Sequence, residues 1–257
     1  MSMYRVYPPY DACYYVGVDL GQTNDSTAIA VVEEPVYVHR IDGWVPYAPG
    51  WHAPDALPPH ALEAAWLSML RHGRPHAPML SARHLERLPL GTNYVDVVAR
   101  IKTLLATSPL AERRCCLLVD ITGVGRGVYD LMRREGLEAI GITIHGGSEL
   151  GGTAEGWSVP KRDLIAAAQV RLQSRTLLVA AGLSEADTLV RELQDYRVKI
   201  DERTAHDSYN ARSGKHDDLV LALSIAVWFR GFFLKYQDAN LDGQMTKIPT
   251  VYNGRRY

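Results

Sequence analysis

Acidic side chains stand at three widely separated points of this sequence, each beside a hydrophobic run. Asp19 and Asp120 each end a short run of strand-forming residues, and the pair Asp217 and Asp218 precedes a strongly apolar stretch. Crowded carboxylates repel one another, so a fold that gathers them generally needs a cation between them. Hard oxygen ligands of this kind suit Mg²⁺ or Mn²⁺. The pattern therefore predicts a centre of two such ions, which is chemistry suited to phosphodiester hydrolysis.

Each acidic position also has a simpler structural explanation. Asp19 before Leu-Gly is ordinary strand-to-turn chemistry, and Asp120 is equally able to cap the helix expected after it. An acidic residue at a helix start favours the helix dipole, which accounts for one of Asp217 and Asp218. Two carboxylates at the start of so apolar a helix place charge at the edge of the core. This pair is therefore the strongest indication of function.

Residues near these acids are candidates for supporting roles. Asp25 would hold a metal-bound water, although a turn former is the simpler interpretation. His216 would orient the attacking water or bind metal, although a solvent-facing histidine is the simpler reading. Lys161 would neutralise phosphate charge or be an ordinary surface lysine. Candidate DNA contacts, which set affinity without reading sequence, are Lys215, Arg212 and Arg126.

The elements that position these residues follow from hydrophobic patterning. Strand-like runs at 14–20, 26–33 and 36–43, joined by short loops, favour an antiparallel meander. Further strands at 82–88, 115–120, 139–145 and 177–180 accompany helices at 94–105, 127–134, 160–174, 184–196 and 217–230. Three strands followed by strand–helix alternation indicate an α/β fold with a mixed sheet, matching the ribonuclease-H-like fold. In that fold the first strand is central and the next parallel strand is its neighbour, which would bring Asp19 and Asp120 together.

The glycines after Asp120 and the proline-rich segment are interpreted as structural features rather than as parts of a binding site. Gly123, Gly125 and Gly127 do not fit a dinucleotide-binding fingerprint, and a tight strand-to-helix turn is the preferred interpretation. Residues 46–78 contain seven of the 14 prolines and several histidines, which indicates an insertion. We therefore expect one domain over residues 1–238, interrupted at about 46–78, and a C-terminal tail over 239–257.

Composition narrows the class of protein. The 257 residues are 47% hydrophobic and 22% charged with a formal charge of −1, as in ordinary soluble globular proteins. Without an overall basic field, any DNA contact must come from a local patch or a partner. Cys13, Cys115 and Cys116 lack the spacing of a zinc site or disulfide framework, so buried free thiols are expected. With no signal-peptide core and no membrane-length apolar run, we expect a cytoplasmic protein without membrane contact (host cytoplasm if phage-encoded).

Four motifs resemble, in order, those of the nuclease domain of phage large terminase subunits. They lie at 16–21, 119–125, 159–162 and 214–223, and the likeness covers most of residues 14–230 apart from the insertion. The His-Asp-Asp-Leu-Val block at a helix start is the most specific of them. The resemblance implies a ribonuclease-H-like fold and endonucleolytic cutting of concatemeric viral DNA during packaging. It also implies two Mg²⁺ or Mn²⁺ ions, with Asp19, Asp120 and one or both of Asp217 and Asp218 as ligands.

In this working scheme, one ion bound to Asp19 and Asp120 would activate a water molecule. A second ion, shared with Asp217 or Asp218, would stabilise the leaving 3′-oxygen. The chain departs from a complete terminase large subunit because it has no P-loop motif, so an ATPase motor is not expected within it. We expect a stand-alone nuclease, a split subunit or a remnant. The expected partner is double-stranded DNA, and further candidates are a separate packaging ATPase, a small terminase subunit or the portal.

Alternatives remain open from the sequence. A RuvC-type junction resolvase resembles the same acidic pattern, but its second helix acid falls one turn further on, where this chain has Leu221. An ATP-binding protein of the actin and chaperone superfamily resembles residues 17–24, but the second Asp-x-Gly loop of that family is not supplied at Asp120. A non-catalytic DNA-end binder is a third possibility. Cleavage of four-way junctions, ATP calorimetry and metal-dependent nicking would separate these readings.

Overall fold

The central strand of the sheet is β1 (Cys13–Asp19), which pairs antiparallel with β2 (Ala28–Glu34) and parallel with β6 (Arg114–Asp120). Its five middle residues are buried, as expected for a strand covered on both faces. The computed structural model describes residues 13–21, 25–34, 37–40, 43–46, 79–123, 125–180, 182–201, 206–211 and 217–240.

Further strands extend the sheet on both sides of this centre. β5 (Leu80–Arg87) pairs antiparallel with β2, and β10 (Leu177–Val179) pairs parallel with β5 at one edge. On the other side β7 (Ala139–His145) is parallel to β6 and is followed by β9 (Gly156–Pro160) and β8 (Gly151–Gly152). In the order β10-β5-β2-β1-β6-β7-β9-β8, the strands β5, β2 and β1 are mutually antiparallel, β1, β6, β7 and β9 run parallel, and β8 is antiparallel to β9. This confirms the predicted ribonuclease-H-like mixed sheet.

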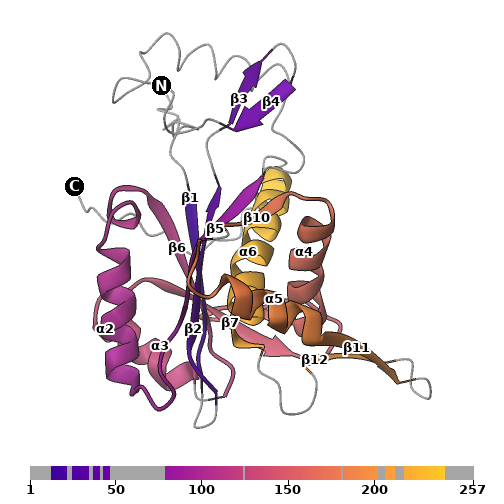
Figure 1. The fold of residues 1–257 in the computed structure, drawn as a ribbon. Helices are drawn as coiled ribbons and strands as arrows, with labels where there is room; N and C mark the ends of the chain where they lie inside the picture. The colour runs from indigo at the N-terminus through magenta and orange to yellow at the C-terminus, as the bar shows by residue number, and fades with distance from the viewer. Residues whose placement is uncertain are drawn as a thin grey trace.

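Helices cover both faces of the sheet (Figure 1), and each face has its own hydrophobic core. One face carries α2 (Tyr94–Leu105) and α3 (Gly125–Arg134), and the other carries α4 (Lys161–Gln173), α5 (Ala186–Asp195) and α6 (Asp218–Asn240). α6 packs against β1 and β2, and it is buried on all sides from its first residue to Arg230. Among the described helices, none combines the length and hydropathy needed to cross a membrane.

The third antiparallel strand of the sheet is β5, which corrects the prediction that the run 36–43 would fill that place. The run instead forms β3 (Tyr37–Arg40), which pairs with β4 (Gly43–Pro46) in a separate two-stranded sheet. Only two residues separate Arg40 from Gly43, a connection length typical of a tight hairpin. The chain therefore folds back on itself before it can join β2.

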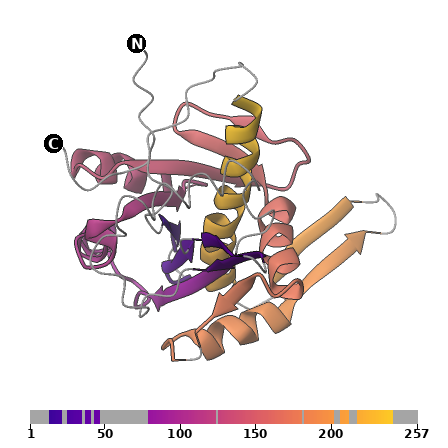
Figure 2. The ribbon, with the colours of Figure 1, turned by 90° about the horizontal axis from the view of Figure 1, so that it is seen from above.

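Other differences concern segments whose sequence pattern is weak. No strand was predicted between residues 145 and 160, but this stretch contains β8 and β9, and Gly156 of β9 pairs with Gly141 of β7. The hairpin of β11 (Tyr196–Asp201) and β12 (His206–Ala211) was not predicted, and it projects from the body of the molecule (Figure 2). α6 continues to Asn240, ten residues beyond its predicted end. The insertion after Pro46 and the tail after Asn240 lie outside the described residues.

Candidate metal centre

Asp19 and Asp120 end two neighbouring parallel strands at the same edge of the sheet. Val18 of β1 is paired with Val119 of β6, so the next residue of each strand is one of the two aspartates. Both aspartates are partly exposed. The predicted adjacency of these two carboxylates follows directly from the parallel register.

A tight turn after β6 fixes the Asp120 side chain. The Thr122 amide donates to Asp120 Oδ1 at 2.8 Å, and the Thr122 hydroxyl oxygen accepts from the Ile144 amide of β7 at 2.8 Å. The turn requires glycine, because Gly123 has a φ of 61° and a β-carbon on Gly125 would stand 2.4 Å from the Asp120 carbonyl oxygen. These glycines therefore form the strand-to-helix turn that the sequence indicated.

Asp217 and Asp218 stand at the start of α6, and each is held by a cation from another element. Lys161, the first residue of α4, donates to Asp217 Oδ2 at 2.8 Å. Arg87, the last residue of β5, donates to Asp218 Oδ2 at 2.8 Å. Asp218 is only 4% exposed, whereas Asp217 is partly exposed. The two adjacent aspartates therefore lie in different surroundings.

Acids that are remote in sequence act on the charge of Asp19. Burial raises the pKa of Asp19 well above its usual value, and the nearby charges of the other three aspartates raise it further, while Lys161 opposes them. Burial also raises the pKa of Asp120, against the hydrogen bonds from Thr122 and the charge of Lys161. We call this group the carboxylate centre; its members are Asp19, Asp120, Asp217 and Asp218.

Two residues that the sequence reading missed complete the surroundings of the carboxylate centre. Arg87 is one, and it ends the strand at 80–87, which places it at this edge of the sheet. The other is Glu192 of α5, which is 6% exposed and whose Oε2 accepts from the amides of Leu219 and Val220. Burial raises the pKa of Glu192 to about 7, although the two amides oppose the shift. The sequence carried one signal for Glu192: it is a single acid on the side of an amphipathic helix that faces the core.

The donor set fits a hard divalent cation in chemistry and in charge. Four carboxylates face two cationic side chains, Lys161 and Arg87, which leaves an excess of negative charge that Mg²⁺ or Mn²⁺ would balance. As the described side chains are placed, no three acidic, histidine or cysteine groups surround a common point closely enough to hold an ion. Arg87 and Lys161 hold two of the four carboxylates, so a bound ion would share Asp218 with Arg87 and would share Asp217 with Lys161 or displace it.

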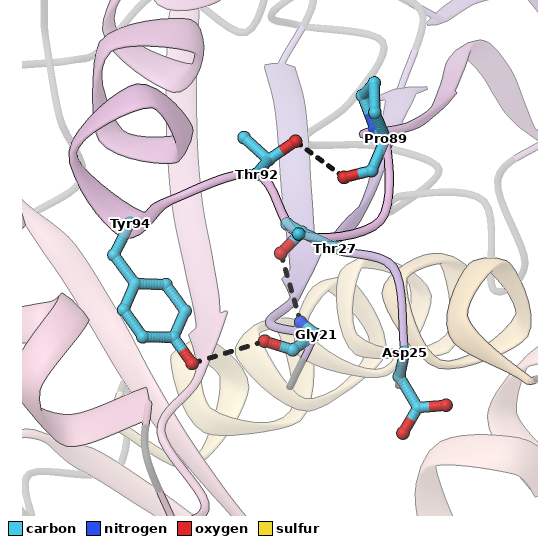
Figure 3. A pocket seen from close by; sticks show the side chains of 7 residues that line it. Gly21, Asp25, Thr27, Pro89, Thr92 and Tyr94 are labelled. Atoms are coloured by element: carbon cyan, nitrogen blue, oxygen red, sulfur yellow. Dashed lines mark hydrogen bonds between the residues drawn. The ribbon is translucent and has the colours of Figure 1, made fainter. Parts of the chain in front are cut away.

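The remaining predicted site residues lie elsewhere or outside the described chain. Asp25 is exposed and is not among the largest contributors to the pKa shift of Asp19. It lines a separate cavity of about 180 Å³, in which the Tyr94 hydroxyl donates to the Gly21 carbonyl at 3.4 Å (Figure 3). Arg126 at the start of α3 forms an ion pair with Glu155. The predicted residues outside the described part of the chain are His216, Lys215 and Arg212.

Comparison with solved structures returns terminase nucleases. The large terminase nuclease from thermophilic phage G20c is 17% identical, covers 84% of each chain and has a TM-score of 0.48. The large terminase from a second thermophilic bacteriophage is 14% identical over 85% of this chain and 40% of its own, with a TM-score of 0.48.

The human cytomegalovirus terminase nuclease domain, soaked with Mn and bound to an inhibitor, is 12% identical over 88% of this chain and 86% of its own, with a TM-score of 0.45. Comparisons with protein families and with curated proteins find no match. The structures returned are thus terminases or terminase nuclease domains, and the likeness to this chain is one of fold.

Proposed function

We propose that this chain is a DNA endonuclease that depends on two Mg²⁺ or Mn²⁺ ions and cuts concatemeric viral DNA during packaging. The observation that carries the proposal is the parallel register that sets Asp19 beside Asp120, with the charges of Asp217 and Asp218 near enough to act on Asp19. Such crowding raises the free energy of the folded protein unless a cation relieves it. We therefore expect these aspartates to bind a cation.

The negative charge of a DNA substrate is a second reason to expect a cation at the carboxylate centre. A phosphodiester is an anion, and four carboxylates without a bound cation would repel it. The two cationic side chains found there, Arg87 and Lys161, are already paired with carboxylates. When bound, the divalent ions would lower the pKa of water so that hydroxide forms near neutral pH, and would stabilise the leaving oxygen.

Within this proposal, Asp19 and Asp120, with one or both of the aspartates of α6, would hold the ions. Thr122 fixes Asp120 by donating its amide to Oδ1, so that this carboxylate keeps one orientation. Lys161 donates to Asp217, and its positive charge opposes the rise in the pKa of Asp19 and of Asp120. If an ion binds Asp217 in place of Lys161, the Lys161 side chain would be able to pair with a DNA phosphate instead.

The DNA and the packaging partners are also proposals. Double-stranded DNA would reach the carboxylate centre through local basic side chains, because the whole chain carries a formal charge of −1. The chain contains no P-loop motif, so an ATPase would come from another segment or subunit. A small terminase subunit and a portal are the other partners expected of a packaging nuclease.

Plasmid digestion tests the proposal. The wild-type chain should nick and linearise supercoiled plasmid with Mg²⁺ or Mn²⁺ but not with a chelator. Asp19→Asn and Asp120→Asn should reduce cutting to the level of the chelator control, while Asp25→Asn, outside the carboxylate centre, should cut normally. Undiminished cutting by both carboxylate variants would refute the site assignment.

The choice of substrate separates the proposal from the resolvase reading. A packaging nuclease should cut linear duplex at least as well as a four-way junction of the same sequence. A strong preference for the junction would favour a RuvC-type resolvase instead. ATP binding measured by calorimetry would instead favour an ATP-binding protein of the actin and chaperone superfamily.

A further inference from the structure

Arg87 connects the carboxylate centre to a buried acid that no sequence motif includes. Its Nη2 donates to Asp218 Oδ2 at 2.8 Å, and its Nη1 lies 3.9 Å from Oε1 of Glu192. Arg87 belongs to β5, Glu192 to α5 and Asp218 to α6. Three elements that come from distant parts of the sequence therefore meet through these side chains.

Glu192 also fixes the first turn of α6. Its Oε2 accepts from the amides of Leu219 and Val220, at 2.9 and 3.1 Å. Amides in the first turn of a helix have no acceptor within the helix, so a buried helix start needs such a partner. Asp217 and Asp218 directly precede these two amides. The position of both carboxylates thus depends on a side chain from another helix.

Stability alone is a poor explanation for this arrangement. Arg87 Nε and Glu192 Oε1 are buried and make no hydrogen bond within the described part of the chain. Buried polar atoms without hydrogen bonds are unfavourable, and a buried ion pair is often no more stable than an apolar substitute. Local arrangements that sacrifice stability are expected where a fold must hold functional groups in place.

Building on the proposed nuclease function, we infer that Arg87 and Glu192 are positioning residues of the carboxylate centre. Glu192 sets where α6 begins, and Arg87 sets the orientation of Asp218 by engaging Oδ2. Neither residue needs to touch DNA or a bound ion. Partners that orient metal ligands in this way are worth about 10- to 100-fold in metal affinity or activity.

Variants of the full chain test this inference against a matched control. Arg87→Ala removes the orienting guanidinium, and Glu192→Ala removes the helix cap. Arg100→Ala is the control, because Arg100 donates to Glu86 at 2.8 and 2.9 Å but takes no part in the carboxylate centre. Three quantities are measured: the unfolding midpoint in chelator, the Mn²⁺ affinity by calorimetry without DNA, and kcat and KM for plasmid nicking.

Arg87→Ala and Glu192→Ala should each weaken Mn²⁺ binding and lower kcat by about 10- to 100-fold with little change in KM. Arg100→Ala should lower only the unfolding midpoint. Free guanidinium ion should restore part of the lost kcat in Arg87→Ala but not in Glu192→Ala, because only the first has a guanidinium-shaped vacancy beside Asp218.

An Arg87→Ala protein with a lowered unfolding midpoint but wild-type Mn²⁺ affinity and kcat would overturn the inference. If Arg87→Ala does not fold, Arg87→Lys replaces it, since lysine keeps the charge but not the forked donors. Wild-type Mn²⁺ affinity and kcat in Arg87→Lys would then overturn the inference. The wild-type measurements distinguish failure of the proposed function from failure of this inference. If the proposed function is wrong, the wild-type chain itself neither binds Mn²⁺ nor cuts DNA.

Discussion

Gly17 of β1 lies so close to α6 that a β-carbon added to it would stand 2.0 Å from the carbonyl oxygen of Ala222. This contact lets the helix that begins with Asp218 settle directly on the strand that ends with Asp19. Gly17→Ala should therefore push α6 away from the sheet and disturb the carboxylate centre as well as the core. We expect a loss of about 3 kcal/mol in the free energy of unfolding, measured by urea denaturation.

Gly127→Ala is the matched control for this prediction. Gly127 lies in α3, and a β-carbon there would meet nothing within 4 Å. Alanine is favoured over glycine in a helix by up to about 1 kcal/mol, so this variant should be unchanged or slightly more stable. If Gly17→Ala proved as stable as Gly127→Ala, the close approach of α6 to β1 would be wrong.

The convergence of Asp19 and Asp120 was predictable because strand order and parallel register follow from the pattern of the chain. A meander followed by strand–helix alternation matches the ribonuclease-H-like fold, in which β6 lies beside β1, so aspartates that end both strands meet. The apolar run after Asp218 likewise indicated a buried helix held against the sheet. These features depend on hydrophobic period and element order, which the sequence carries directly.

Arg87 and Glu192 were not predictable in the same way, because their roles depend on side-chain contacts between elements far apart in sequence. Nothing local to Glu192 indicates that it caps a helix beginning at Asp218. β9 was missed because its few residues include a glycine and a proline, which are depleted in strands. The prediction that the run 36–43 joins the main sheet was wrong because a strand pattern does not specify which strand becomes its partner.

Glu86 on β5 should contribute pH-dependent stability. Burial raises its pKa, but hydrogen bonds from Arg100 and His84 outweigh burial and hold the pKa below its usual value of 4.5. Because the pKa is lower in the folded state, the stabilisation is present above pH 4.5 and is lost as the pH falls through the folded-state value. Glu86→Gln should cost about 0.5–1 kcal/mol at pH 7 in urea denaturation, and the cost should vanish in acid.

The control for this pH effect is Glu135→Gln. Glu135 pairs with Lys102 at 3.0 Å, but both side chains are about half exposed, at 51% and 54%. Exposed pairs of this kind contribute little, so the variant should match the wild type at both pH values. A Glu86→Gln cost that stayed constant into acid would show that the ion pair is not its source.

The three thiols should differ in reactivity. Cys115 and Cys116 are buried free thiols, as predicted, whereas Cys13 is partly exposed. Burial raises the pKa of Cys115 to about 12, with a smaller contribution from Cys13, so little thiolate forms near neutral pH. Iodoacetamide at pH 8 should label Cys13 first and Cys115 only after unfolding, as followed by peptide mass spectrometry. Equal labelling rates in the native protein would contradict the burial of β6.

Asp19→Asn should make the metal-free protein more stable while it abolishes cutting. Asp19 is repelled by the other three members of the carboxylate centre, and the amide removes that repulsion with little change in shape. A single stabilising substitution commonly contributes about 0.5–2 kcal/mol, and we expect a gain in this range in chelator at pH 7.

Mn²⁺ should reverse this order of stability. An ion that binds only the folded state stabilises it in proportion to its occupancy, so the wild type should gain and Asp19→Asn should gain much less. Asp25→Asn is the control, because Asp25 is exposed and outside the carboxylate centre, and it should follow the wild type in both conditions. If Asp19→Asn were less stable than the wild type in chelator, the wild-type carboxylate would be satisfied without a metal, and the argument from crowding to a cation would fail.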